Sequence, residues 1–168
     1  MAAPFAVRFE SEKDIPTIHA IESAAFGREG EAILVHALRE LDQVFISLVA
    51  IEGDSVVGHI CFSRVTIEGA KGLFSALAPL AVLPSHQRRG IGSMLVTAGI
   101  EECRRRDVDA VFVVGHPAYY SRFGFTLASE IGIKCEFDVP AEAFRVIQIG
   151  RRRTPQGVLR YPAPFHQL

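Results

Sequence analysis

A glycine turn between two apolar segments limits what this chain can fold into more than any other feature. The apolar run LAPLAVL, residues 77–83, is typical of a strand that ends before Pro84. After Gly90 and Gly92, apolar residues recur at the helical spacing i, i+3, i+4 and i+7, beginning at Ile91. A strand, a glycine turn and a helix in succession leave unpaired backbone N–H groups at the positive end of the helix dipole. Glycine lets an anion approach that backbone, so the sequence predicts a phosphate or pyrophosphate site.

Two common phosphate-binding turns do not fit this segment. A Walker A loop requires GxxxxGK[ST], and no Lys-Ser or Lys-Thr follows a glycine in the chain. A dinucleotide fingerprint requires glycine or alanine three residues after its second glycine, where this chain has Leu95. What remains is the pattern Q/R-x-x-G-x-G, formed by QRRGIG at residues 87–92.

The remaining segments predict a mixed α/β or α+β domain. Residues 11–26 have an apolar helical face, and Ser11 with Asp14 resembles a capping pair. Residues 44–82 are rich in Val, Ile, Phe and Leu and are broken by EGDS and EGAKG, which predicts a meander of three antiparallel strands. DAVFVV, residues 109–114, is an unalternating apolar strand of the kind buried beneath helices. The predicted order is strand, helix, helix, three strands, helix, strand, short helix and strand, with loops and a short strand in the tail.

Length and composition limit the class of protein further. A chain of 168 residues that is 49% hydrophobic and 22% charged predicts one globular domain, spanning residues 1–168. The formal net charge of −1 gives no bulk attraction to nucleic acid or to an acidic membrane. The chain has three cysteines, Cys61, Cys103 and Cys135, which are too few for a disulfide framework. No leader or spanning segment is evident in the sequence. We therefore expect a cytoplasmic protein.

Two arginine runs, 104–106 and 151–153, raise nucleic-acid binding as a rival function. The first closes a predicted helix, where cations complement the dipole, and the second lies beside a Thr-Pro turn. Because aromatic and basic residues do not interleave here, we expect neither a nucleic-acid nor a membrane partner.

Two motifs together resemble one enzyme family. LAVLPSHQRRGIGSML, residues 80–95, resembles the acetyl-CoA signature of the GNAT superfamily of N-acetyltransferases. GHPAYYSRFGF, residues 115–125, resembles its second signature, an aromatic residue followed by x-x-x-G-F, and with GVLRYPAPF is similar to the bacterial YhbS-like subgroup. The resemblance implies a mixed, mostly antiparallel, splayed central sheet with helices on both faces. It places the acetyl-CoA core at about 44–125 and C-terminal strands and tail at 126–168.

The resemblance also implies how acetyl-CoA binds. The backbone of Leu80, Ala81 and Val82 runs beside the pantetheine arm, and a strand that parts from its neighbour there leaves N–H and C=O groups free for the two pantetheine amides. We therefore expect the sheet to splay at this strand. For the two arginines of the turn, solvated surface charge is the alternative role. The residues implied to cradle the pyrophosphate are Arg88, Arg89, Gly90, Ile91, Gly92 and Ser93.

Acetyl transfer to an amine needs a neutral amine, a donor to the carbonyl oxygen and a proton for the departing thiolate. Tyr120 stands where the family has its general acid, and simple packing is its alternative role. A strand N–H near Val82 is the implied carbonyl donor. The sequence assigns no base: the candidates, besides water, are His116, His59, Glu22 and Glu31.

One departure from the family pattern affects the cofactor contacts. Most members have Asn followed by Ala in the helix before the tyrosine, whereas this chain has GHPA at 115–118. His116 is a candidate substitute for that asparagine. No metal is expected, because the six His residues form no HExxH pattern and no Cys/His cluster.

The sequence thus predicts an acetyl-CoA-dependent N-acetyltransferase that acts by direct attack in a ternary complex. A catalytically silent acyl-CoA-binding regulatory module is the alternative. The amine acceptor is left open between a small molecule and a protein amino group, because acceptor contacts come from variable loops. The tail either lines the acceptor side, through Tyr161 and Phe165, or packs in the core. Homodimers are common among such proteins, and the sequence does not fix the oligomeric state.

Overall fold

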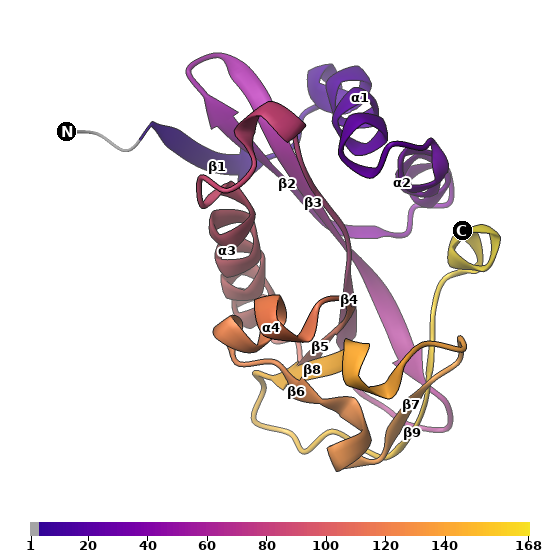
Figure 1. Ribbon diagram of the computed structural model, residues 1–168. Coiled ribbons are helices and arrows are strands. Elements are labelled where there is room, and N and C mark those ends of the chain that lie inside the picture. Colours follow the sequence, from indigo (N-terminus) through magenta and orange to yellow (C-terminus); the bar gives the residue numbers. More distant parts are fainter. Residues whose placement is uncertain (1–3) are drawn as a thin grey trace.

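The computed structural model describes residues 4–168, which form one mixed sheet with helices on both faces (Figure 1). The main sheet has the order β1-β2-β3-β4-β5-β8-β6, and β9 joins β3 to β7 beside it. β4 and β5 are parallel, whereas every other pair on the main path is antiparallel. The strands are β1 (Phe5–Phe9), β2 (Val44–Glu52), β3 (Ser55–Ile67), β4 (Phe74–Val82), β5 (Ala110–Val114), β6 (Thr126–Leu127), β7 (Ile133–Cys135), β8 (Phe144–Gln148) and β9 (Gly157–Arg160).

The predicted helices form where their apolar faces meet the sheet. α1 (Ile15–Phe26) follows a capping box of Ser11 and Asp14, as the sequence predicts. α2 (Gly30–Glu40) comes next along the chain, and α3 (Ile91–Arg105) begins directly after the glycine turn. α4 (Pro117–Tyr120) is a single short turn.

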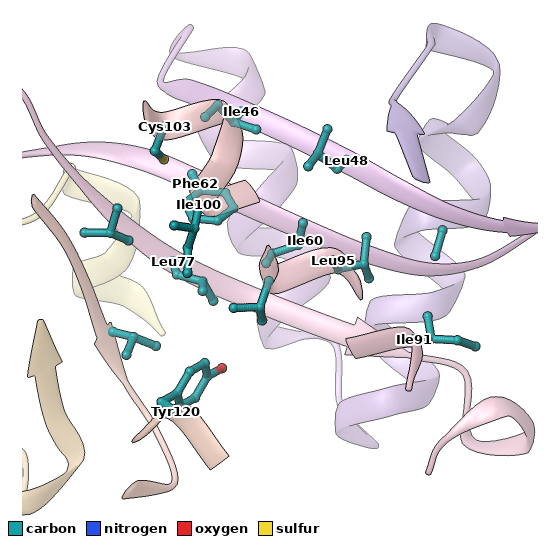
Figure 2. Packing of buried hydrophobic residues seen from close by; sticks show 14 of the residues in the cluster. Ile46, Leu48, Ile60, Phe62, Leu77, Ile91, Leu95, Ile100, Cys103 and Tyr120 are labelled. Atoms are coloured by element: carbon teal, nitrogen blue, oxygen red, sulfur yellow. The ribbon is translucent and has the colours of Figure 1, made fainter. Parts of the chain in front are cut away.

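Strand alternation gives each face of the sheet its own core. On β3, Ile60 and Phe62 pack with Ile91 and Leu95 of α3, in the cluster that Figure 2 shows. Cys61 points to the opposite face, where it packs with residues of α2. Because side chains alternate along a strand, one strand can bury both faces. In Figure 1, α1 and α2 accordingly lie on one side of the strands and α3 on the other.

The predicted splay lies between β4 and β5. Their pairing covers only Phe74 to Ala76 of β4, opposite Ala110 to Phe112 of β5. Within the described residues, the rest of β4 has no partner strand on this side, although it stays paired with β3 up to Val82. The two strands therefore diverge, and the free edge of β4 faces the opening.

The C-terminal region contains more strand than the sequence analysis expected. β8 was not anticipated as a separate strand, yet it pairs with all five residues of β5 and separates β5 from β6. β8 has the sequence FRVIQ, in which two apolar residues stand side by side, so it shows neither strict alternation nor an apolar run. The edge of β5 with which it pairs defines it as a strand. Tyr161 and Phe165 of the tail pack with Phe137, Leu34 and Leu38. In the part of the chain that the structure describes, no helix has the length and apolar character needed to cross a membrane.

Candidate functional site

A cleft of about 410 Å³ opens at the start of α3, beside the free edge of β4. We call it the cofactor cleft. Most of its lining comes from one continuous stretch of chain that includes the predicted glycine turn, and α4 with the turn after it closes the other side. The lining residues are Leu80, Val82, His86, Gln87, Arg88, Gly90, Ile91, Gly92, Ser93, Tyr119 and Arg122.

The start of α3 presents backbone donors to this cleft. Gly90 has φ +83°, a left-handed conformation that favours glycine, and no side chain caps the first turn. Met94 N–H already donates to Gly90 C=O, so the N–H groups of Ile91, Gly92 and Ser93 come before the first helical hydrogen bond. Such a helix start stabilises a bound anion.

Gly92 also keeps the cleft open. A Cβ atom at this position would lie 2.7 Å from the Tyr119 hydroxyl oxygen, well inside contact distance. Any side chain here would therefore fill the space between α3 and α4. The second glycine of QRRGIG is explained by this close approach.

The cationic side chains around the turn do not all face the cleft. Arg88, at φ +63°, lines it, and Arg122 lines the opposite wall with its guanidinium 4.6 Å from the Tyr119 ring centre. Arg89 points elsewhere: its Nη2 lies 3.4 Å from a Glu52 oxygen, and its guanidinium stacks 4.9 Å from the Phe5 ring centre. Arg89 is therefore not among the lining residues of the cleft, and neither is Ala81, which is buried in the sheet.

A second cavity, of about 670 Å³, occupies the opening between β4 and β5. It shares Leu80, Gln87 and Tyr119 with the cofactor cleft, so the two spaces are contiguous. Its other lining residues come from α1, α2, β4, the end of β5 with the turn after it, α4 and the tail. They are Phe26, Glu31, Leu34, Leu77, Ala78, Pro79, Val114, Gly115, His116, Tyr120 and Leu168.

Tyr120 lines the second cavity from α4 and lies at the margin of the α3-side core (Figure 2). Its ring packs edge-on against Tyr119 and Phe125, with ring centres 5.0 and 5.7 Å away. A Cβ at Gly115 would lie 2.4 Å from this ring, so the glycine lets the ring approach the backbone. Burial, with a smaller contribution from Tyr119, raises the pKa of Tyr120, which keeps its phenol protonated at neutral pH.

The four candidate bases divide between the cavity and the protein interior. His116 and Glu31 line the second cavity. Glu22 and His59 are fully buried, 2.7 Å apart from carboxylate oxygen to Nδ1, and line neither space.

Glu22 and His59 belong to a buried polar chain that joins four elements of the fold. His59 Nε2 lies 2.8 Å from the Ser47 hydroxyl, and Ser47 also contacts Glu10, which accepts two hydrogen bonds from Arg39. Burial raises the pKa of Glu22, and this effect outweighs the opposite effect of its hydrogen bond to His59. We therefore infer that this buried polar chain holds α1 and α2 against β2 and β3.

Sequence analysis did not single out several residues that line these spaces. Arg122 lines the cofactor cleft and lies in the second motif, two residues after Tyr120. This position in the motif was the sequence signal that could have identified it as a site residue. Phe26 and Leu34 lie on consecutive helices far from Leu168 in sequence, and the patterns around all three residues indicate only apolar packing. Within residues 4–168 there is no group of three or more His, Cys, Asp or Glu side chains arranged to hold a metal ion.

Comparison with known proteins connects this geometry to a family. Residues 6–128 match the model of the acetyltransferase (GNAT) domain. The chain is 38% identical over 143 residues to the N-acetyltransferase YjhQ of Escherichia coli, covering 82% of this chain and 79% of YjhQ. It is 36% identical over 141 residues to the N-acetyltransferase YhbS of Escherichia coli, covering 83% of this chain and 84% of YhbS.

Solved structures agree with the fold, and two of them contain CoA or acetyl-CoA. Escherichia coli YhbS, crystallised in complex with CoA, superimposes with a TM-score of 0.94 at 32% identity, over 99% of this chain and 94% of that one. A GNAT family acetyltransferase from Brucella melitensis, in complex with acetyl-CoA, superimposes with a TM-score of 0.82 at 34% identity, over 96% and 97% of the two chains.

Proposed function

Because this chain belongs to the GNAT family of N-acetyltransferases, we propose that it transfers an acetyl group from acetyl-CoA directly to an amine, with Tyr120 as general acid. Acetyl-CoA binds in the cofactor cleft and the amine in the second cavity. The observation that carries this proposal is the contact between the two spaces at Leu80, Gln87 and Tyr119, with Tyr120 beside the junction. Two substrates held in contiguous spaces can react without a covalent enzyme intermediate.

The cofactor cleft suits the two ends of acetyl-CoA. The N–H groups at the start of α3, with Arg88 and Arg122, suit a pyrophosphate, and Gly92 leaves room for it. The unpaired edge of β4 from Leu80 to Val82 suits the amides of pantetheine. The solved YhbS and Brucella melitensis relatives, with CoA and acetyl-CoA respectively, support this assignment.

The reaction needs the enzyme mainly to position groups and to move one proton. The acceptor arrives as an ammonium ion and loses a proton to become the nucleophile. Its nitrogen then attacks the thioester carbonyl carbon, the C–N bond forms, the C–S bond breaks, and the nitrogen releases a second proton to solvent. Tyr120 gives its phenol proton to the thiolate sulfur and regains one from solvent. The products are an amide, free CoA thiol and one net proton.

Tyr120 suits this role because of its location and its surroundings. It lines the second cavity next to Tyr119, which lines both spaces. Burial keeps its phenol in the protonated form that a general acid needs.

The test is Tyr120→Phe, with Tyr161→Phe as the matched control. Tyr161 is also packed among aromatic rings, but it lines neither cavity. Loss of a general acid lowers kcat by about 100-fold or more. We expect that loss in Tyr120→Phe, with the Kd for acetyl-CoA unchanged by calorimetry, and normal kcat in the control. An unchanged kcat in Tyr120→Phe would remove the general-acid role.

A further inference from the structure

We propose that the acceptor is a small primary amine on an apolar body without a carboxylate, and that Glu31 binds its ammonium group. This inference rests on the proposed function, because it names the substrate class of the second cavity. Three observations on the described residues carry it: the apolar lining, the single acidic side chain of the cavity wall, and a wall that contains neither Lys nor Arg.

The lining of the second cavity is mainly apolar. Its apolar side chains come from five separate parts of the fold. Such a surface favours a ligand that buries hydrocarbon or an aromatic ring. These residues are Phe26, Leu34, Leu77, Ala78, Pro79, Val114 and Leu168.

Glu31 is the only acidic side chain among the residues that line this cavity in the described chain. It lies on the first turn of α2 and is only 4% exposed. Its carboxylate accepts hydrogen bonds from Arg28, one of them 2.9 Å long from Nε to Oε1. Arg28 itself has a side chain that is 62% exposed, and it is not part of the lining. Each carboxylate oxygen has a second lone pair, so Glu31 can accept from an ammonium group as well.

The charge balance disfavours acceptors that carry a carboxylate. No Lys or Arg is found among the described residues that line this cavity. His116 is the one lining side chain among these residues that could become cationic, so a substrate carboxylate would lose its hydration there without a permanently charged partner, and it would lie near Glu31. The cationic side chains of the site, Arg88 and Arg122, line the cofactor cleft instead.

The size of the cavity favours a small molecule over a protein lysine. A volume of about 670 Å³ falls in the range that small ligands fill. The four methylene groups of a lysine would leave most of the apolar lining uncovered. The expected acceptor therefore fills the cavity with its own apolar body.

Matched acceptors test the substrate class. Release of CoA thiol is measured at saturating acetyl-CoA with 2-phenylethylamine, phenylalaninamide, phenylalanine, spermidine and a lysine peptide. We expect the first two to give a kcat/KM about tenfold or more above that of phenylalanine, which differs from the amide mainly by its carboxylate. Equal or better use of phenylalanine, spermidine or the peptide would overturn the inference and leave acetyl transfer intact.

Matched variants test the residue. Glu31→Gln should raise the KM for 2-phenylethylamine about tenfold while leaving the KM for acetyl-CoA unchanged. Glu40→Gln makes the same chemical change on the same helix, at an exposed site outside the cavity, and should change neither KM. Arg28→Gln breaks the same ion pair from its exposed partner and should lower the amine KM, because Glu31 then has no competing cation.

The three variants separate amine binding from damage to the fold. If Glu31→Gln and Arg28→Gln raise the amine KM alike, the ion pair is only structural and the role of Glu31 is overturned. If Glu31→Gln behaves like Glu40→Gln, the role is overturned as well. If acetyl-CoA binds but no amine releases thiol, the proposed acetyl transfer fails, and the inference fails with it.

Discussion

The two cavities of this protein meet at Tyr119, but they are built in different ways. The cofactor cleft is lined mostly by residues 80–93, and the groups proposed to bind the pyrophosphate there are mainly backbone N–H groups at the start of one helix. The second cavity is lined by side chains from α1, α2, β4, the end of β5, α4 and the tail. One site therefore depends on a local backbone conformation, whereas the other depends on how distant segments pack.

This difference affects how each site responds to substitution. A backbone-built cleft tolerates most side-chain changes and fails when its backbone or its free space is altered. A cavity built of side chains instead depends on the contacts that hold its elements together. The predictions below test this contrast, beginning with the largest expected effect.

The buried polar chain behind the second cavity should matter most for stability. Glu22→Ala leaves His59 buried without its carboxylate partner, and breaking a buried pair costs about 3–5 kcal/mol. The control is Glu29→Ala, which removes an exposed carboxylate 2.9 Å from His19 and should leave the unfolding curve unchanged. Denaturant unfolding measures the free energy of unfolding of both variants. Equal losses of unfolding free energy in the two variants would show that this buried polar chain does not hold α1 and α2.

Filling the cofactor cleft should have the next largest effect. Gly92→Val places a side chain where a Cβ already approaches the Tyr119 hydroxyl to 2.7 Å, so acetyl-CoA affinity should fall about 100-fold. Thr97→Val, on the exposed side of the same helix, should bind normally. Calorimetric titration with acetyl-CoA gives both values. Normal binding by Gly92→Val would contradict the description of this cleft as limited by its backbone.

Acid should weaken the attachment of α1, which supplies Phe26 to the second cavity. The Arg8 guanidinium, 2.7 Å away, is the main cause that lowers the pKa of Asp14 to about 2 from its usual 3.8. Because the folded-state pKa is lowered, the stabilisation is present above about pH 4 and is lost as pH falls towards 2. Asp14→Asn should therefore be less stable than the wild type by about 1 kcal/mol at pH 6, since Arg8 is partly exposed.

Measuring unfolding of both proteins between pH 2 and 6 tests this assignment, and the difference should shrink towards the acid end of the range. A difference that stays constant with pH would show that the Asp14 charge is not responsible.

Single cleft arginines should have the smallest effect. Arg88→Gln should weaken acetyl-CoA binding only about threefold, and less so at high salt, because an exposed cation contributes little beside several backbone donors. Arg89→Gln should not change the affinity, since its side chain is held by Glu52 and Phe5. A larger loss in Arg89→Gln than in Arg88→Gln would reverse this assignment.

The sequence by itself determined the parts of this protein that are local. Residues 80–95 contain the strand, the turn and the helix start in one segment, so periodicity and two glycines predict the cleft. The meander from β2 to β4 and the helical faces of α1 to α3 follow from the same short-range patterns. Hydrophobic period and backbone freedom are properties of neighbouring residues, and they can be recognised without the fold.

Only the tertiary structure decided the features that depend on distant segments. β8 is defined by its pairing with β5. Arg88 lines the cleft and Arg89 does not, because the Arg89 side chain contacts Glu52 and Phe5 instead. The tertiary structure also distinguishes Glu31, on a cavity wall, from Glu22, which is buried against a histidine. In sequence both are glutamates of amphipathic helices. Their different surroundings arise from packing between elements, because burial and partner charges are set by residues far away along the chain.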